Sequence, residues 1–425
     1  MGEQASSGGE SPRLGRRLRL VDAVVLGLGS MIGAGVFAAI GPAAEVAGSG
    51  LLVGLAVAAV VAYANATSSA QLAAVYPQAG GTYVYGRERL GPFWGYLAGW
   101  GFAVGKTASL AAMALTIGAY AFPGYERPTG MVAVVAMVAV NYSGVRKTAA
   151  VTKVIVVFVV AVLAVVVFTG LMAPTATTDH LADLDRGGLK GKLQAAGLLF
   201  FAFAGYARIA TLGEEVVDPA RTIPKAIPIA LGITLGVYAS VAFTALLAVG
   251  SDVLASAAAP LAAAAGDVPW AATLVRVGGS VAATGALLSL LAGVSRTTFA
   301  MARDGHLPAW LARVHPIHET PHRAELAVGV VVVVVVAVAD LRGAIGFSSF
   351  AILAYYAIAN AAAFTQPDHQ RRWPKALQVF GILGCALLAV LLPISSVIGG
   401  VLLIAVGAVL WLVRKSGSRS IGSRS

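Results

Sequence analysis

The chain has 425 residues, of which 58% are hydrophobic and only 12% are charged. Soluble domains carry about 25% charged residues. One compact core cannot absorb so much apolar surface, whereas a lipid bilayer can. The net charge of +11 would suggest a nucleic-acid partner for a soluble protein. Here the basic residues collect on one side of the expected topology, so the charge indicates orientation in a membrane and no nucleic-acid partner is expected.

Apolar segments that approach or exceed the length of a bilayer-crossing helix, about 20 residues, recur along the whole chain. Their ranges are 20–45, 50–73, 92–121, 129–143, 151–173, 193–213, 226–250, 271–301, 323–341, 345–365, 376–393 and 395–413. The fourth is short, which leaves the division between the fourth and fifth open. We expect an all-α integral membrane protein with about twelve transmembrane helices.

Basic loops set the expected orientation. With the N-terminus inside, every inside loop carries arginine or lysine, as the positive-inside rule requires. Those loops are 74–91, 144–150, 214–225, 302–322 and 366–375. An even number of spans then places both termini in the cytoplasm, with 1–19 as a basic tail and 414–425 as a disordered one. The polar, basic start of the chain does not resemble a signal peptide.

Glycines gather in the first and sixth segments. The first contains Gly27-Leu28-Gly29-Ser30-Met31-Ile32-Gly33-Ala34-Gly35, and the sixth contains Gly205 and Gly213. Interrupted helices at matching places in two halves indicate an inverted repeat with a binding site at the midplane. The freed backbone groups need partners, and a bound zwitterion can supply them, with its carboxylate at a helix N-terminus. The alternative is that these glycines serve close helix packing.

Four segments in order resemble the amino acid–polyamine–organocation (APC) superfamily of transporters. They are GSMIGAGVF at 29–37, PQAGGTY at 77–83, FFAFAGY with EEVVDP at 200–219, and SR with ARDG at 295–305. The resemblance extends over roughly residues 18–415. It implies a leucine-transporter-type fold of two inverted five-helix repeats, 20–173 and 193–365, followed by two additional helices at 376–413.

The resemblance also implies that the α-carboxylate and α-amino groups of an amino acid meet the backbone of the first and sixth spans. The matching positions are Met31, Ile32, Gly33, Ala34, Gly35, Phe201, Ala202 and Ala204. Small residues suit this role because the ligand must approach the main chain closely. Phe201 is the candidate gate over the substrate, and ordinary core packing is the alternative.

Lys153 opens the fifth span. A lysine within hydrocarbon costs roughly 3 kcal/mol. In sodium-independent members of the superfamily, a lysine near the start of the fifth span takes the place of the bound cation. The resemblance implies that the ammonium of Lys153 bridges backbone groups of the first and eighth spans. It is therefore the candidate coupling residue, and protons are possible partners. The alternative is a lysine whose ammonium reaches the membrane interface.

Three further basic residues, Lys106, Arg208 and Arg296, fall inside or near spans. Arg208 follows Ala207, which occupies a position where many members of the superfamily carry an acidic residue. The absence of that acidic residue argues against a cationic substrate and favours a neutral amino acid. Arg208 either binds an acid group of the substrate or, as we favour, holds a structural partner such as Glu45. Lys106, in the third span, is either a second functional cation or the partner of a carboxylate that the sequence does not identify.

We therefore expect secondary active transport of an amino acid across the plasma membrane by alternating access, without sodium, by proton coupling or exchange. A polyamine or another organic amine is the alternative substrate, and a non-transporting amino acid sensor the alternative function. Paired carboxylates, metal clusters and activated nucleophiles are missing from the spans, which argues against an enzyme. No metal and no cofactor are expected, and the oligomeric state stays open.

Overall fold

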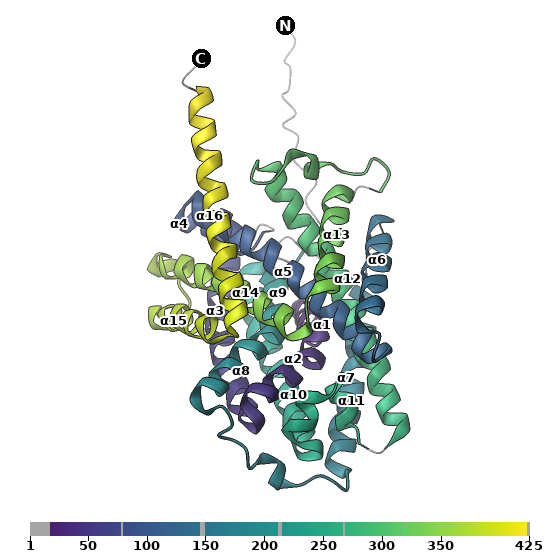
Figure 1. Ribbon diagram of the computed structural model, residues 1–425. Helices are drawn as coiled ribbons and strands as arrows, with labels where there is room; N and C mark the ends of the chain where they lie inside the picture. The colour runs from purple at the N-terminus through teal and green to yellow at the C-terminus, as the bar shows by residue number, and fades with distance from the viewer. Residues whose placement is uncertain are drawn as a thin grey trace.

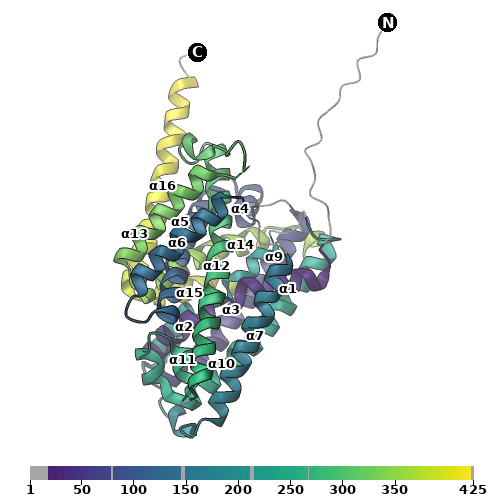
Figure 2. The same ribbon diagram turned by 90° about the vertical axis from the view of Figure 1, so that its right-hand side faces the viewer.

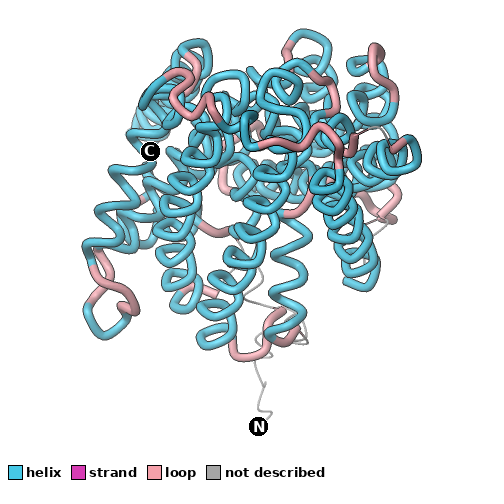
Figure 3. Tube along the Cα trace, turned by 90° about the horizontal axis from the view of Figure 1, so that it is seen from below, coloured by secondary structure: helices cyan, strands magenta, loops and turns pink. Residues whose placement is uncertain are grey.

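The computed structural model describes residues 18–77, 80–144, 149–210, 215–266, 268–318 and 320–422. The described chain forms one elongated bundle of helices joined mostly by short loops (Figures 1 and 3). The N-terminal half contains α1 (Leu20–Met31), α2 (Ala34–Ala47), α3 (Leu51–Val75), α4 (Thr82–Leu90), α5 (Pro92–Ala121), α6 (Glu126–Tyr142) and α7 (Ala149–Met172).

The second half begins with the pair α8 (Gly188–Phe203) and α9 (Ala207–Ala210), joined by a 3-10 turn at Ala204–Tyr206. It continues with α10 (Pro219–Ser256), α11 (Pro260–Ala264), α12 (Pro269–Arg303), α13 (His322–Val338), α14 (Leu341–Phe364), α15 (Lys375–Leu391) and α16 (Ile394–Gly422). Each apolar segment of the sequence overlaps one of these helices or an interrupted pair.

The outer surface of the bundle suits a bilayer. Eight helices within the described ranges are long and apolar enough to cross a membrane, and α1 and α15 are shorter apolar helices. Large hydrophobic side chains stay exposed along the outside, such as Val154 and Phe168 on α7, Val334 on α13 and Leu383 on α15. Such a continuous apolar surface is not tolerated in water, so the protein is a multi-pass membrane protein.

Both glycine-bearing spans are interrupted, as the sequence predicts. α1 ends at Met31, and Ile32 (ψ 60°) and Gly33 (ψ −133°) leave the helical region before α2 begins. The sixth segment breaks at the 3-10 turn between α8 and α9. Figure 2 shows α1 and α9, which contact each other, beside α7 in the bundle.

The ends of several elements differ from the predicted boundaries. The loop predicted at 74–91 contains α4, and α11 lies between α10 and α12. α10 is longer than its predicted span because it starts at Pro219 and continues beyond a kink at Gly250, where φ is 73°. α16 extends to Gly422, beyond the boundary predicted at 413.

Candidate functional site

The two helix breaks lie against each other backbone to backbone. A Cβ atom placed on Gly205 would be 2.2 Å from the Ser30 carbonyl oxygen, and one on Gly35 would be 2.6 Å from the Ala202 Cα. Separations this short leave no room for a side chain. Glycine is therefore required here by close approach, which brings the peptide groups of both breaks into one place.

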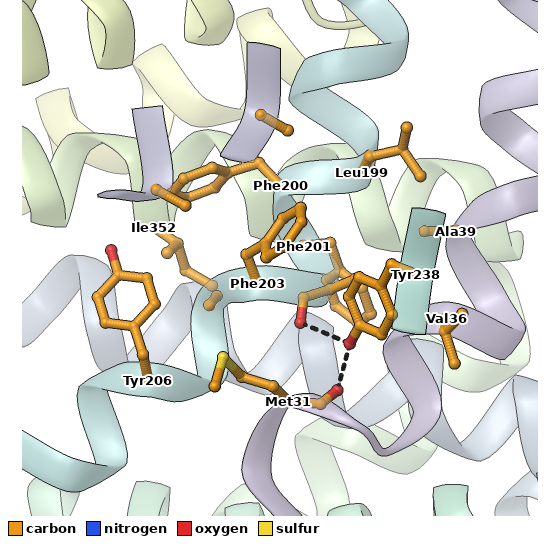
Figure 4. Packing of buried hydrophobic residues seen from close by; sticks show 14 of the residues in the cluster. Met31, Val36, Ala39, Leu199, Phe200, Phe201, Phe203, Tyr206, Tyr238 and Ile352 are labelled. Carbon is orange, nitrogen blue, oxygen red and sulfur yellow. Dashed lines mark hydrogen bonds between the residues drawn. The ribbon is translucent and has the colours of Figure 1, made fainter. Parts of the chain in front are cut away.

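Tyrosine hydroxyls bind carbonyls that the breaks release. The Tyr238 hydroxyl, from α10, lies 2.5 Å from the Met31 oxygen and 3.1 Å from the Ala202 oxygen, so one side chain bridges both breaks (Figure 4). The Tyr356 hydroxyl, from α14, donates to the Ala204 oxygen at 3.2 Å. Sequence reasoning missed Tyr238, because its ring lies on a distant span and no local pattern marks its partners.

Peptide N–H groups at the start of α2 can donate hydrogen bonds to a ligand. The cap residue Gly33 offers no side-chain hydrogen bond, and no described residue accepts a hydrogen bond from the N–H of Ala34 or Gly35. The first N–H groups of a helix have no partner within it and carry a partial positive charge. This end of α2 is therefore suited to a carboxylate.

A cavity of about 310 Å³ adjoins the breaks. This volume suits a small ligand. The lining includes eight of the eleven residues predicted for the site: Met31, Ala34, Gly35, Phe201, Ala202, Ala204, Arg208 and Lys106. Ile32, Gly33 and Lys153 do not line it. Ile32 is buried, and a Cβ on Gly33 would lie 3.1 Å from the Ala286 Cβ of α12.

Two helical faces complete the lining. α5 contributes Phe102, Lys106, Ser109 and Met113, and α12 contributes Ala286, Ser289, Leu290, Gly293, Arg296 and Thr297. Both sets recur every three or four residues and so share one side of their helix. The sequence does not reveal these faces, because the spans are apolar on all sides and carry no usable hydrophobic periodicity.

The cavity lining is rich in cations. It includes Lys106, Arg208 and Arg296, whereas Glu215 is the single carboxylate among the described lining residues. The charges of Arg296 and Glu215 both act on Arg208. Glu45, suggested above as a structural partner of Arg208, instead forms an ion pair with Arg342. The suggested Arg208–Glu45 pair is therefore not present.

Lys153 lies beside the break and not in it. Its ammonium donates to the Asp22 carboxylate at 2.7 Å, near the start of α1, and its side chain is 46% exposed. The neighbouring Thr152 and Val156 face α1, where both would touch a Cβ on Gly29. The helical rotation of about 100° per residue turns Lys153 away from that contact. In this conformation its ammonium therefore contacts a carboxylate, not the implied backbone of the first and eighth spans.

The cavity reaches toward one end of the bundle. Its lining includes Gly80, just before α4, Tyr83 in α4, and Glu215, which follows α9 in the chain. Leu18 pairs with this last segment, through its N–H to the Glu215 oxygen at 3.0 Å. The Tyr83 hydroxyl donates to Asp304 at 2.6 Å. Burial, reinforced by this acceptor, raises the pKa of Tyr83 above its usual range, so Tyr83 stays a neutral donor.

Toward the opposite end, the Tyr120 side chain connects three helices. The Tyr120 hydroxyl donates to the Phe37 oxygen at 3.1 Å and accepts from the Leu261 N–H at 3.3 Å. These bonds tie α5, α2 and α11 together, and none of the three residues lines the cavity. The cavity lining therefore extends on the side of the bundle that carries Leu18 and α4.

A helical membrane protein with two interrupted helices around a central cavity has the architecture of a substrate transporter. The sequence matches the family described as amino acid permease over residues 18–417. It is 59% identical, over 95% of this chain and 92% of the relative, to an uncharacterized transporter of Mycobacterium tuberculosis (strain ATCC 25618 / H37Rv).

Relatives with named substrates are more distant. The branched-chain amino acid permease BcaP of Bacillus subtilis (strain 168) is 26% identical over 89% of this chain and 86% of its own length. Cationic amino acid transporter 7, chloroplastic, of Arabidopsis thaliana is 28% identical over 84% of this chain and 67% of its own length. The chain belongs to the amino acid permease family of the APC superfamily. It is a transporter of amino acids or related substrates and not an enzyme.

Proposed function

We propose that this protein carries an amino acid across the plasma membrane by alternating access around the central cavity. In this proposal it is a sodium-independent secondary transporter, coupled to protons or to exchange, with twelve spans and both termini in the cytoplasm. The repeats at 20–173 and 193–365 rock about the site. The supporting observation is the backbone contact between the two helix breaks, beside free N–H groups that line the cavity.

The substrate's α-carboxylate binds the N–H groups of Ala34 and Gly35 at the start of α2. Its α-amino group is placed near the carbonyl oxygens of the breaks. Those of Met31 and Ala202 contact the Tyr238 hydroxyl in this conformation, so the ammonium group either shares these acceptors with Tyr238 or displaces it. Phe201 lines the cavity and is 7% exposed, which suits a gate that moves when substrate enters.

The conformation of the structure corresponds to an inward-facing state in this proposal. The positive-inside rule places α4 and Leu18 on the cytoplasmic side, and the cavity extends toward them. Outward opening requires the Tyr120 bonds to Phe37 and Leu261 to break. Lys153 takes part in coupling through Asp22, because the ion pair between α7 and α1 is maintained only while these helices keep their present spacing.

Counterflow in proteoliposomes tests the proposal. Vesicles are preloaded with unlabelled amino acids, and labelled ones are added outside singly. We expect accumulation of at least one amino acid, independent of a sodium gradient. Gly33→Leu should abolish it, because a Cβ at Gly33 already lies 3.1 Å from Ala286. Gly236→Leu is the matched control, since nothing lies within 4 Å of a Cβ there.

The outcomes separate this proposal from its rivals. Accumulation of polyamines or other amines without any amino acid would identify the alternative substrate. Saturable binding of an amino acid by folded protein, with no accumulation in vesicles, would identify a sensor. Either result contradicts the proposed amino acid transport.

A further inference from the structure

Lys106 is a basic residue on the cavity wall. It lies on α5, and the neighbouring Gly105 packs so closely against α14 that a Cβ there would be 2.3 Å from the Ala351 Cβ. Lys106 itself lines the cavity together with Phe102 and Met113. The hydroxyl of Ser109, one turn away, lies 2.5 Å from the Ser348 hydroxyl and so already has a partner. No described residue accepts a hydrogen bond or forms an ion pair with the Lys106 ammonium.

Lys106 shares the cavity lining with more cations than carboxylates. Arg208 and Arg296 add two cations to the same lining, and Glu325, outside the lining, is a carboxylate whose charge interacts with that of Arg296. Glu215 is the one described carboxylate there, and it acts on Arg208. Like charges in a confined, poorly solvated space repel each other strongly. A bound anion would relieve that repulsion and would supply the acceptor that Lys106 lacks.

We propose that the substrate is an amino acid with an acidic side chain, aspartate or glutamate. This inference rests on the proposed function and specifies its substrate class. The α-carboxylate occupies the start of α2, and the second carboxylate binds Lys106 on α5. Arg296 and Arg208 contribute a positive field that attracts the anion and repels cationic amino acids. A neutral amino acid, which the sequence favours through Ala207, would leave Lys106 without an acceptor.

Glutamate and glutamine provide the sharpest comparison, because they have the same shape and differ in charge. Counterflow of each into proteoliposomes gives kcat/KM for both substrates. We expect the wild type to favour glutamate at least tenfold. Lys106→Gln should remove this preference chiefly by raising the KM for glutamate about tenfold to a hundredfold, the range for a lost hydrogen bond between charged groups. Competition by arginine should be weak.

Two further variants make the test specific. Lys190→Gln removes the same charge from an exposed lysine at the start of α8, outside the cavity, and should keep the preference for glutamate. Arg296→Gln should reduce the preference by a smaller factor. It also keeps the inference testable if Lys106→Gln does not give a monodisperse protein in detergent.

The inference is overturned if the wild type transports glutamine, or another uncharged amino acid, as well as it transports glutamate. It is also overturned if folded Lys106→Gln and Arg296→Gln both keep the wild-type preference. Accumulation of neutral or cationic amino acids without glutamate would contradict the inference and leave the proposed amino acid transport intact. Accumulation of no amino acid at all would contradict both.

Discussion

Replacing Tyr238 by phenylalanine tests whether its hydroxyl holds the two helix breaks together. The side chain is 2% exposed and lies between the Met31 and Ala202 carbonyl oxygens. One hydroxyl proton serves these two acceptors, so the loss counts as one strong hydrogen bond. Interhelical hydrogen bonds in a membrane average about 0.6 kcal/mol. A buried polar group left without a partner costs about 1–3 kcal/mol. We therefore expect Tyr238→Phe to destabilise the protein by about 1–2 kcal/mol.

The assay is reversible unfolding in mixed micelles with increasing SDS, compared between the wild type and Tyr238→Phe. Tyr63→Phe, at a 43% exposed position on α3, is the matched control and should change stability by less than about 0.5 kcal/mol. Equal stabilities of Tyr238→Phe and Tyr63→Phe would refute the reasoning. It would mean that the released carbonyls find water or another donor without cost.

Three other perturbations test further parts of the account. Gly205→Ala should prevent folding or abolish transport, because its Cβ would meet the Ser30 carbonyl at 2.2 Å; a monodisperse and active variant would contradict this packing. Burial alone would raise the pKa of the Asp183 carboxyl, but hydrogen bonds from Ser251 and Ser49 and the nearby charge of Arg186 hold it below its usual value. The carboxylate therefore stabilises the fold above about pH 4 and ceases to do so as the pH falls through the lowered pKa. Asp183→Asn should accordingly cost about 1 kcal/mol at pH 7, and its difference from the wild type, measured by unfolding at several pH values, should shrink below about pH 4. Replacing external sodium by choline should leave uptake unchanged, and a fall would contradict sodium independence.

The sequence predicts the elements of the fold because membrane spans and helix breaks are local properties. About 20 apolar residues specify a span, and the clustered glycines of 27–35 specify where α1 and α2 separate. The family motifs also predict that Met31, Ala34, Gly35 and Phe201 belong to one site, and the structure places all four in the cavity lining.

The remaining features depend on how each helix is rotated in the bundle, which an apolar span does not encode. Lys153 shows the difficulty: its position at the start of a span is evident, but the direction of its side chain toward Asp22 depends on the packing of Thr152 and Val156 against α1. Tyr238 was missed for the same reason, since it acquires its role from contacts with spans far away in the chain. Arg296 was recognised as a basic residue in a span and in a family motif, but its place in the cavity lining could not be assigned.

Alternating access at the cavity is the central claim, and site-directed labelling tests it most directly. The natural chain has one cysteine, Cys385, which is 1% exposed and can be replaced by alanine. In that background, Thr297→Cys places a thiol in the cavity, and Thr273→Cys, near the other end of α12, reports the opposite side. An impermeant maleimide should label residue 297 from the cytoplasmic side of oriented vesicles. A transported amino acid should change that rate and leave the labelling of residue 273 unaltered. A labelling rate at residue 297 that no amino acid changes would contradict the account.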